Sequence, residues 1–166
     1  FGQPAPVART TVGLAPSALA FSGSGEVLIG LKTGEVLLWD AVGEPVQLAA
    51  GQGEVVEIRA GDDQFDYLQG AAWVPSRQSD WLMTTERWGQ RVKVTNVRTG
   101  AMICKFGQKG AGYGQFRSPM GVAVTSDSSF VIVTDTINDR VQVLKLVIAA
   151  DGQSAQLEFV RCIGDG

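Results

Sequence analysis

The chain has 166 residues, of which 45% are hydrophobic and 21 are glycine, so it is long enough for one domain with a sizeable core and many turns. Its net charge of −3 argues against a nucleic-acid-binding surface that covers the whole molecule. No stretch is apolar for long enough to span a bilayer, and the lack of histidine removes serine–histidine catalysis and the commonest zinc ligand from this chain.

The first part of the chain contains four short runs that are typical of β-strands and are separated by turn residues. These runs are PSALAF at 16–21, EVLIGL at 26–31, EVLLWD at 35–40 and PVQLAA at 45–50. In the second run, apolar residues alternate with the period of a strand that has one face toward a core. The sequence therefore predicts four strands and no helix in this unit.

The same order of runs then occurs twice more. The second unit has runs at 69–74, 80–86, 91–97 and 101–106, and the third has runs at 119–124, 130–135, 140–146 and 157–163. Glycines at the unit boundaries, Gly2, Gly51, Gly107 and Gly164, are spaced 49, 56 and 57 residues apart. Four strands in a period near fifty predict the blades of a β-propeller.

We therefore expect an all-β fold, a partial β-propeller of four-stranded antiparallel blades. Residues 1–166 form one domain in this interpretation, with repeat units at 1–50, 51–106 and 107–163. Three blades would leave two apolar sheet faces open. We expect the ring, of six blades, to be completed by further blades of a longer chain or by a second copy.

The third unit resembles the NHL repeat. Residues 106–146 contain a glycine-rich GQF lead-in, a proline before the first strand, an apolar second strand that ends in aspartate, and an Asn-x-Arg-Val turn. The second unit matches at Gln64-Phe65 and Arg91-Val92 but has Gln69 in place of the proline, and the first keeps Pro16 but lacks the arginine. A WD-repeat propeller is the competing assignment, because LLWD occurs at 37–40.

Several conspicuous residues have structural interpretations. Asp135 and Arg140 flank a hairpin turn, so we expect a charge-assisted hydrogen bond between them, worth about 1 kcal/mol if it is partly exposed. Phe65 and Phe116 are expected to fill the gaps between adjacent blades. Gly107 and Gly164 mark the points where the chain crosses to the next blade, where glycine tolerates positive φ.

Candidate binding residues lie mainly in one basic segment. Residues 86–117 contain 7 basic residues and 1 acidic residue. Trp88 is predicted to lie in a polar turn, where an indole has little core to enter, so it can bind a partner or cap the neighbouring blade. The candidates are Arg87, Trp88, Arg91, Tyr113 and Arg117.

The favoured function is a non-enzymatic scaffold that binds a protein partner through its blade loops, without cofactor, metal or membrane contact. The sequence presents no catalytic residues, because it assembles no nucleophile, base and oxyanion site. Resemblance to RNA-binding NHL propellers leaves RNA as an alternative partner for 86–117. A resemblance to propeller lyases or lactonases implies a further alternative, an enzyme that holds a metal ion in its central channel. In that case Asp135 or Glu86 could bind calcium.

Cys104 and Cys162 are expected to stay reduced. In the alignment of the repeats Cys104 corresponds to Arg161, so the two thiols point to opposite faces of their strands. Two cysteines are too few for a disulfide framework and lack metal-ligand spacing. Together with the lack of a visible leader, they favour an intracellular location.

Overall fold

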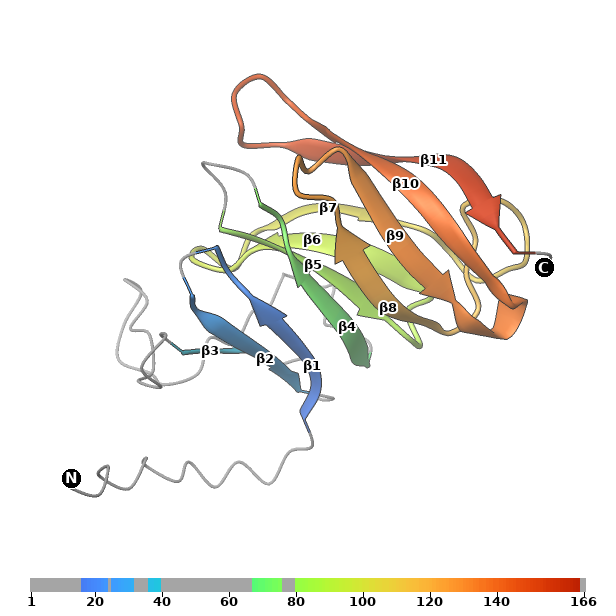
Figure 1. The fold of residues 1–166 in the computed structure, drawn as a ribbon, viewed down its shortest axis with the longest axis horizontal. Helices are drawn as coiled ribbons and strands as arrows, with labels where there is room; N and C mark the ends of the chain where they lie inside the picture. Colours follow the sequence, from blue (N-terminus) through green and yellow to red (C-terminus); the bar gives the residue numbers. More distant parts are fainter. Residues whose placement is uncertain (1–15, 24, 32–35, 40–66, 76–79, 165–166) are drawn as a thin grey trace.

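The computed structural model describes residues 16–23, 25–31, 36–39, 67–75 and 80–164, and all structural statements concern these residues (Figure 1). Its elements are β1 (Pro16–Phe21), β2 (Val27–Leu31), β3 (Val36–Trp39), β4 (Leu68–Trp73), β5 (Trp81–Glu86), β6 (Arg91–Asn96), β7 (Met102–Phe106), β8 (Pro119–Val124), β9 (Phe130–Asp135), the 3₁₀ helix η1 (Thr136–Asn138), β10 (Arg140–Ile148) and β11 (Ala155–Ile163). The predicted strand at 45–50 and Phe65 lie outside the described residues.

The strands form three antiparallel sheets in chain order. The described part of the first sheet has the order β1-β2-β3, the second has β4-β5-β6-β7, and the third has β8-β9-β10-β11. Each sheet, or blade, is thus a meander in which every strand pairs with the next one along the chain. The fold is all-β, as predicted, and a single 3₁₀ turn among the described residues, η1, closes the turn after β9, with Asp139 in a left-handed conformation at φ 51°.

The first strands of the three blades lie next to one another. β4 packs between β1 and β8, and Figure 1 shows this succession across the molecule. The fourth strands of the second and third blades, β7 and β11, also pack together. Sheets stacked in this way around their first strands are blades of a β-propeller, as the sequence predicted.

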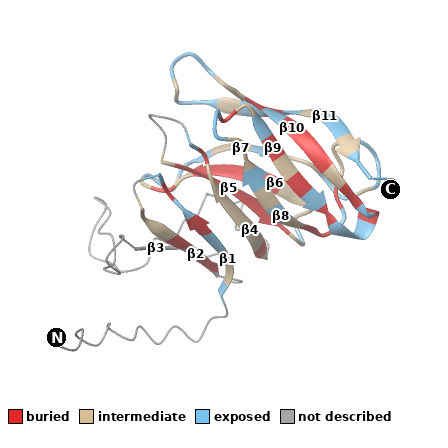
Figure 2. Cartoon of the chain, in the orientation of Figure 1, coloured by how far each residue is buried: buried red, intermediate tan, exposed pale blue. Residues whose placement is uncertain are grey.

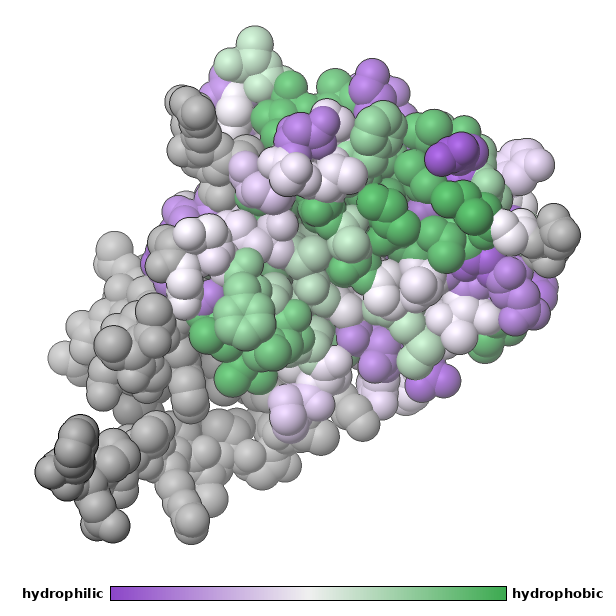
Figure 3. Space-filling model, in the orientation of Figure 1, coloured by the Kyte–Doolittle hydropathy of each residue, from purple (hydrophilic) through white to green (hydrophobic). Residues whose placement is uncertain are grey.

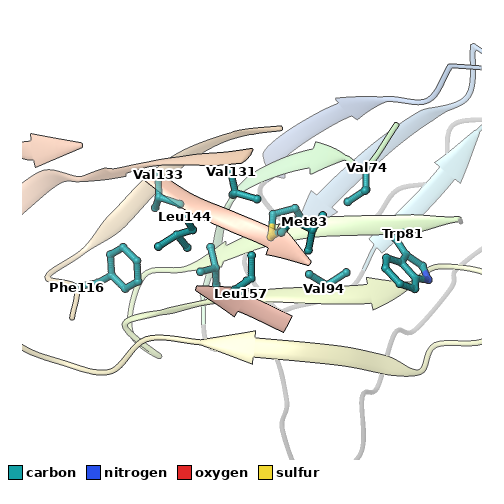
Figure 4. Close-up of a cluster of buried hydrophobic side chains, with 11 residues drawn as sticks. Val74, Trp81, Met83, Val94, Phe116, Val131, Val133, Leu144 and Leu157 are labelled. Atoms are coloured by element: carbon teal, nitrogen blue, oxygen red, sulfur yellow. The ribbon is translucent and has the colours of Figure 1, made fainter. Parts of the chain in front are cut away.

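Two apolar clusters fill the spaces between blades. Ala20, Leu28, Leu68, Leu82 and Val97 join the first blade to the second. The larger cluster joins the second blade to the third; its fully buried members include Met83, Val92, Val94, Phe116 and Leu144 (Figure 4). Burial is therefore concentrated between the sheets, and Figure 2 shows it as red bands along the strands. The blades are held together mainly by the hydrophobic effect.

The second and third blades approach each other closely at Gly70 of β4. A Cβ at this position would collide with the carbonyl oxygen of Met120 in β8. The hydroxyl of Thr85 donates a hydrogen bond of 2.6 Å to the same carbonyl. Only glycine leaves room for this contact between strands of different blades.

We expect Gly70→Ala to lower the free energy of unfolding by about 1 to 3 kcal/mol, because the new methyl group must push two backbones apart. Urea unfolding measures this change. Gly23→Ala is the matched control, since a Cβ there would meet nothing within 4 Å. Equal stability of the two variants would show that the approach of β4 to β8 is loose.

Both cysteines carry free thiols. Val94 pairs with Cys104 and Val143 pairs with Arg161, which is the register that the repeat alignment predicts. Burial raises the pKa of the Cys104 thiol to about 11. In the part of the chain that the structure describes, no helix is long and apolar enough to cross a bilayer.

Candidate interaction surface

Three loops leave the blades from the same edge. The β5–β6 turn and the β9–β10 turn each follow the second strand of a blade, and the connector from β7 to β8 follows the fourth strand. Because the strands are antiparallel, the second and fourth strands end on the same side of the blade. Arg87 and Trp88 lie in the first of these loops, and Tyr113 and Arg117 lie in the second. Arg91, at the start of β6, borders the same edge. The structure therefore places all five candidate binding residues on one side of the molecule.

The connector at 107–118 is held by side chains of the third blade. Arg140 pairs with Asp135 directly across β9 and β10, with 2.8 Å between Nε and Oδ2. The Arg140 guanidinium also donates hydrogen bonds to the carbonyls of Ala111, Gly112 and Gln115 at 2.7 to 3.0 Å. The pair is buried, with 5% of the Arg140 side chain and none of the Asp135 side chain exposed, whereas the sequence suggested a partly exposed contact.

Two amides, which the sequence analysis missed, extend this contact. Asn138 donates to Asp135 at 2.8 Å and to the carbonyl of Gly110 at 3.0 Å. Gln142 donates to Asp135 and Gln115, and it accepts from the backbone of Gly114. We call Asp135, Asn138, Arg140 and Gln142 the connector anchor. Its residues lie two to three positions apart in the sequence, around one hairpin turn. This spacing could have indicated that their side chains bind the same segment of the chain.

Gly107, Gly164 and Phe116 shape the ends of the connectors. Gly107 has φ 105° and Gly164 has φ 101°, a region that side-chain-bearing residues rarely adopt. A Cβ on Gly107 would lie 2.5 Å from the ring of Phe116, which is fully buried between the second and third blades. The connector therefore turns at a glycine and inserts an aromatic ring into the core.

The second blade has a related cluster of charges. Glu86 is fully buried; Arg91 binds one of its carboxylate oxygens, and the Nζ of Lys93 lies 2.6 Å from the other. Arg91 and Lys93 occupy the positions that Arg140 and Gln142 have in the third blade, since Glu86 pairs with Arg91 as Asp135 does with Arg140. Arg91 is thus engaged with Glu86, while 20% of its side chain remains exposed.

Trp88 is the most exposed residue of its turn and stacks on another aromatic ring. Its side chain is 65% exposed, and its ring lies 5.2 Å from that of Tyr67 at an interplanar angle of 13°. The Arg87 guanidinium lies 6.0 Å from the centre of the Tyr67 ring, at the limit for a cation–π interaction. The indole is therefore supported on one face and open to solvent elsewhere.

Hydrogen bonds join this turn to the other two loops. Arg87 Nε donates to Ser118 Oγ at 2.8 Å, and the backbone of Ser118 donates to Gln90 Oε1 at 2.7 Å. The backbone of Ile137 donates to the carbonyl of Arg117 at 3.0 Å. We call Arg87, Trp88, Arg117 and Ile137, with Tyr67 stacked on Trp88, the Trp88 surface. Tyr67 and Ile137 were not among the candidate residues predicted from the sequence.

The backbone around the Trp88 surface adopts unusual conformations. Of the five described non-glycine residues with positive φ, four lie in its segments: Tyr67, Gln90, Ser118 and Asp139. Such conformations cost free energy and persist only where the surrounding contacts hold them, and they are concentrated at functional sites.

Tyr113 lies apart from the Trp88 surface. Its ring stacks on Phe159 of β11, with centroids 5.0 Å apart, and 77% of its side chain is exposed. β11 is the last strand of its blade, whereas Tyr67 directly precedes β4, a first strand. Trp88 therefore lies beside the first strand of a blade and Tyr113 beside the fourth strand of a blade, although both loops leave the same edge.

The basic residues of 86–117 do not form one face. Arg98 lies in the β6–β7 turn, at the opposite edge of the blade, where it pairs with Glu26 and Asp80. Burial opposes its charge, but these two carboxylates raise the pKa of Arg98. Lys93 is buried beside Glu86. The excess positive charge in the sequence is therefore divided between two edges and the interior.

The third blade exposes apolar side chains on the face turned away from the second blade. Phe130, Val160 and Ile163 are 39%, 44% and 52% exposed. Figure 3 shows green, apolar atoms gathered over this sheet and a second patch over β1, where Leu19 and Phe21 are 55% and 64% exposed. A further blade or a second copy, as predicted from the sequence, would pack on faces of this kind.

The described residues contain no group of three or more His, Cys, Asp or Glu side chains that could hold a metal ion.

A comparison with solved structures finds the same architecture. The crystal structure of Kluyvelomyces marxianus Hsv2, a seven-bladed β-propeller, matches with a TM-score of 0.61 at 11% sequence identity. The match covers 88% of this chain and 48% of that one, so the chain spans about half the length of the Hsv2 structure. No family model and no curated protein matches the chain. The likeness shows a β-propeller fold.

Proposed function

We propose that this propeller is a non-enzymatic, NHL-like scaffold that binds a protein partner through the Trp88 surface. The observation that carries the proposal is the exposed Trp88, stacked on Tyr67 at the end of a rigid blade. Tryptophan, tyrosine and arginine are the residue types that contribute most to protein–protein binding. Exposed aromatic residues held in place lose little conformational entropy on binding.

The architecture supports a binding role. Loops at one edge of a propeller are presented by rigid sheets, and here hydrogen bonds between loops of two blades fix their relative positions. The NHL-like motif at 106–146 belongs to this proposal, since it is the part of the chain that forms the connector and the third blade. Fold alone does not define function, so the argument depends on the Trp88 surface.

We expect Trp88→Ala to weaken partner binding by about 2 kcal/mol or more, roughly thirtyfold in Kd, with little change in stability because the side chain is exposed. The immobilised full chain is incubated with an extract of the encoding organism, and bound proteins are compared between wild type and variant. Tyr113→Ala is the matched control, because Tyr113 is also an exposed, stacked aromatic residue but lies outside the Trp88 surface.

Proteins that are retained by wild type and Tyr113→Ala but lost by Trp88→Ala, with or without nuclease treatment, are the expected result. Identical sets of bound proteins for all three chains would contradict the proposal. Capture that disappears after nuclease treatment would instead assign the surface to RNA.

A further inference from the structure

The partner's chemistry can be read from the charged groups of the Trp88 surface. Arg117 is exposed and makes no ion pair with another described residue. Arg87 uses its Nε for Ser118, and no hydrogen bond to a described residue engages its two terminal amino groups. Both guanidinium groups therefore have donors available in the planar arrangement that matches a carboxylate.

Two acidic residues of the described part of the chain, Glu86 and Asp135, lie beside these loops and are buried. Glu86 is fully buried and bound by Arg91 and Lys93, and Asp135 is fully buried and bound by the connector anchor. Asp139 is the exposed carboxylate in the three loop segments. Among the described residues of the three loops, the cations Arg87 and Arg117 therefore outnumber the one exposed carboxylate, on a chain whose net charge is −3.

Two exposed apolar side chains accompany these charges. Trp88 and Ile137 are 65% and 61% exposed, and Ile137 is joined through its backbone to Arg117. Each can be covered by an apolar side chain of a partner, while carboxylates of the partner reach the arginines. This combination of a few charges with an aromatic anchor is typical of sites for short peptide segments.

A nucleic-acid strand fits the same surface less well. Binding a strand requires a row of cations that follows successive phosphates. Arg98 is held at the opposite edge by Glu26 and Asp80, and Lys93 is buried against Glu86. Two available arginines match a few carboxylates better than they match a polyphosphate chain.

Accordingly, we propose that the Trp88 surface binds a short acidic segment of a partner protein, with apolar side chains against Trp88 and Ile137 and carboxylates on Arg87 and Arg117. This inference rests on the proposed function and specifies the partner's chemistry. Opposite charges would speed the encounter and align the segment, and the aromatic contact would hold it.

The test uses three labelled probes and the full chain, with binding followed by fluorescence anisotropy. The first probe is a peptide of about eight residues that alternates Asp and Glu with Leu and Pro. The second has the same sequence with Asn and Gln in place of the acids, and the third is oligouridylate of similar length. We expect the acidic peptide to bind at least about tenfold more tightly than either of the others.

Variants then assign the binding to the surface. Arg117→Glu, at an exposed side chain, is expected to weaken binding of the acidic peptide about tenfold, and Arg87→Glu and Trp88→Ala should do the same. Arg161→Glu, an exposed arginine on β11, is the matched control for the change in charge and should bind as wild type does.

Equal binding of the acidic and amide peptides, equal effects of Arg117→Glu and Arg161→Glu, or tighter binding of oligouridylate would each overturn the inference. These outcomes differ from failure of the proposed function. If Trp88-dependent capture of proteins persists while the acidic peptide does not bind, the scaffold role stands and only the acidic partner is wrong.

Discussion

Replacing Arg140 with alanine is expected to lower the free energy of unfolding by about 3 to 5 kcal/mol. The substitution leaves the fully buried Asp135 carboxylate without its charged partner. It also removes the donors for three carbonyls of the connector, those of Ala111, Gly112 and Gln115. The larger cost comes from the fully buried Asp135 carboxylate, because a buried charge that loses its charged partner carries the cost of its desolvation. A loss of this size is a large fraction of the stability of a typical domain.

Urea unfolding, followed by intrinsic fluorescence and circular dichroism, measures the loss. Arg140→Lys keeps the charge but not the planar fork, so it should recover only part of the stability. Arg161→Ala removes an exposed arginine from the same blade and should change stability by less than about 0.5 kcal/mol. If Arg140→Ala were as stable as Arg161→Ala, the connector anchor would not hold the third blade in place.

Phe116→Ala is the second substitution with a large expected effect, a loss of about 3 to 5 kcal/mol. The ring is fully buried in the cluster between the second and third blades, and it packs against Gly107. Its removal leaves a cavity between two sheets that a rigid connector cannot close. Thermal unfolding by calorimetry gives the change in midpoint and enthalpy.

Phe130→Ala is the matched control, because Phe130 is 39% exposed on the outer face of the third blade. It should cost about 1 kcal/mol or less, and Phe116→Leu, which keeps most of the volume, should lie between the two. Equal losses for Phe116→Ala and Phe130→Ala would mean that the connector ring does not join the blades.

The strands were predictable because their signals are local. Turn residues and a period of two fix most boundaries, so that the run at 119–124 is β8 and the run at 130–135 is β9. The prediction missed the extension of the last hairpin, where Ile148 pairs with Ala155 beyond the expected ends of both strands. The two strands are longer than expected because they pair with each other across the hairpin. The residue pattern of one strand alone does not reveal such pairing.

The candidate site was predictable only in part. Exposure of Trp88 followed from a tryptophan in a polar turn, and the pairing of Asp135 with Arg140 followed from the hairpin. The burial of that pair depends on the path of the connector, which no sequence pattern gives. The contribution of Tyr67 depends on contact with Trp88, 21 positions later in the chain. Long-range contacts of this kind arise from packing rather than from local propensity.

The division of the core between blades has a consequence for synthesis on the ribosome. The second blade is complete in sequence at Phe106, but its cluster residues Val92 and Val94 share their core with residues of the third blade such as Leu144, which follows Phe106 by 38 residues. At 5 to 20 residues per second, that delay is about 2 to 8 seconds. During this time a finished sheet presents an uncovered apolar face to other nascent chains, so each blade depends on prompt arrival of the next to escape aggregation.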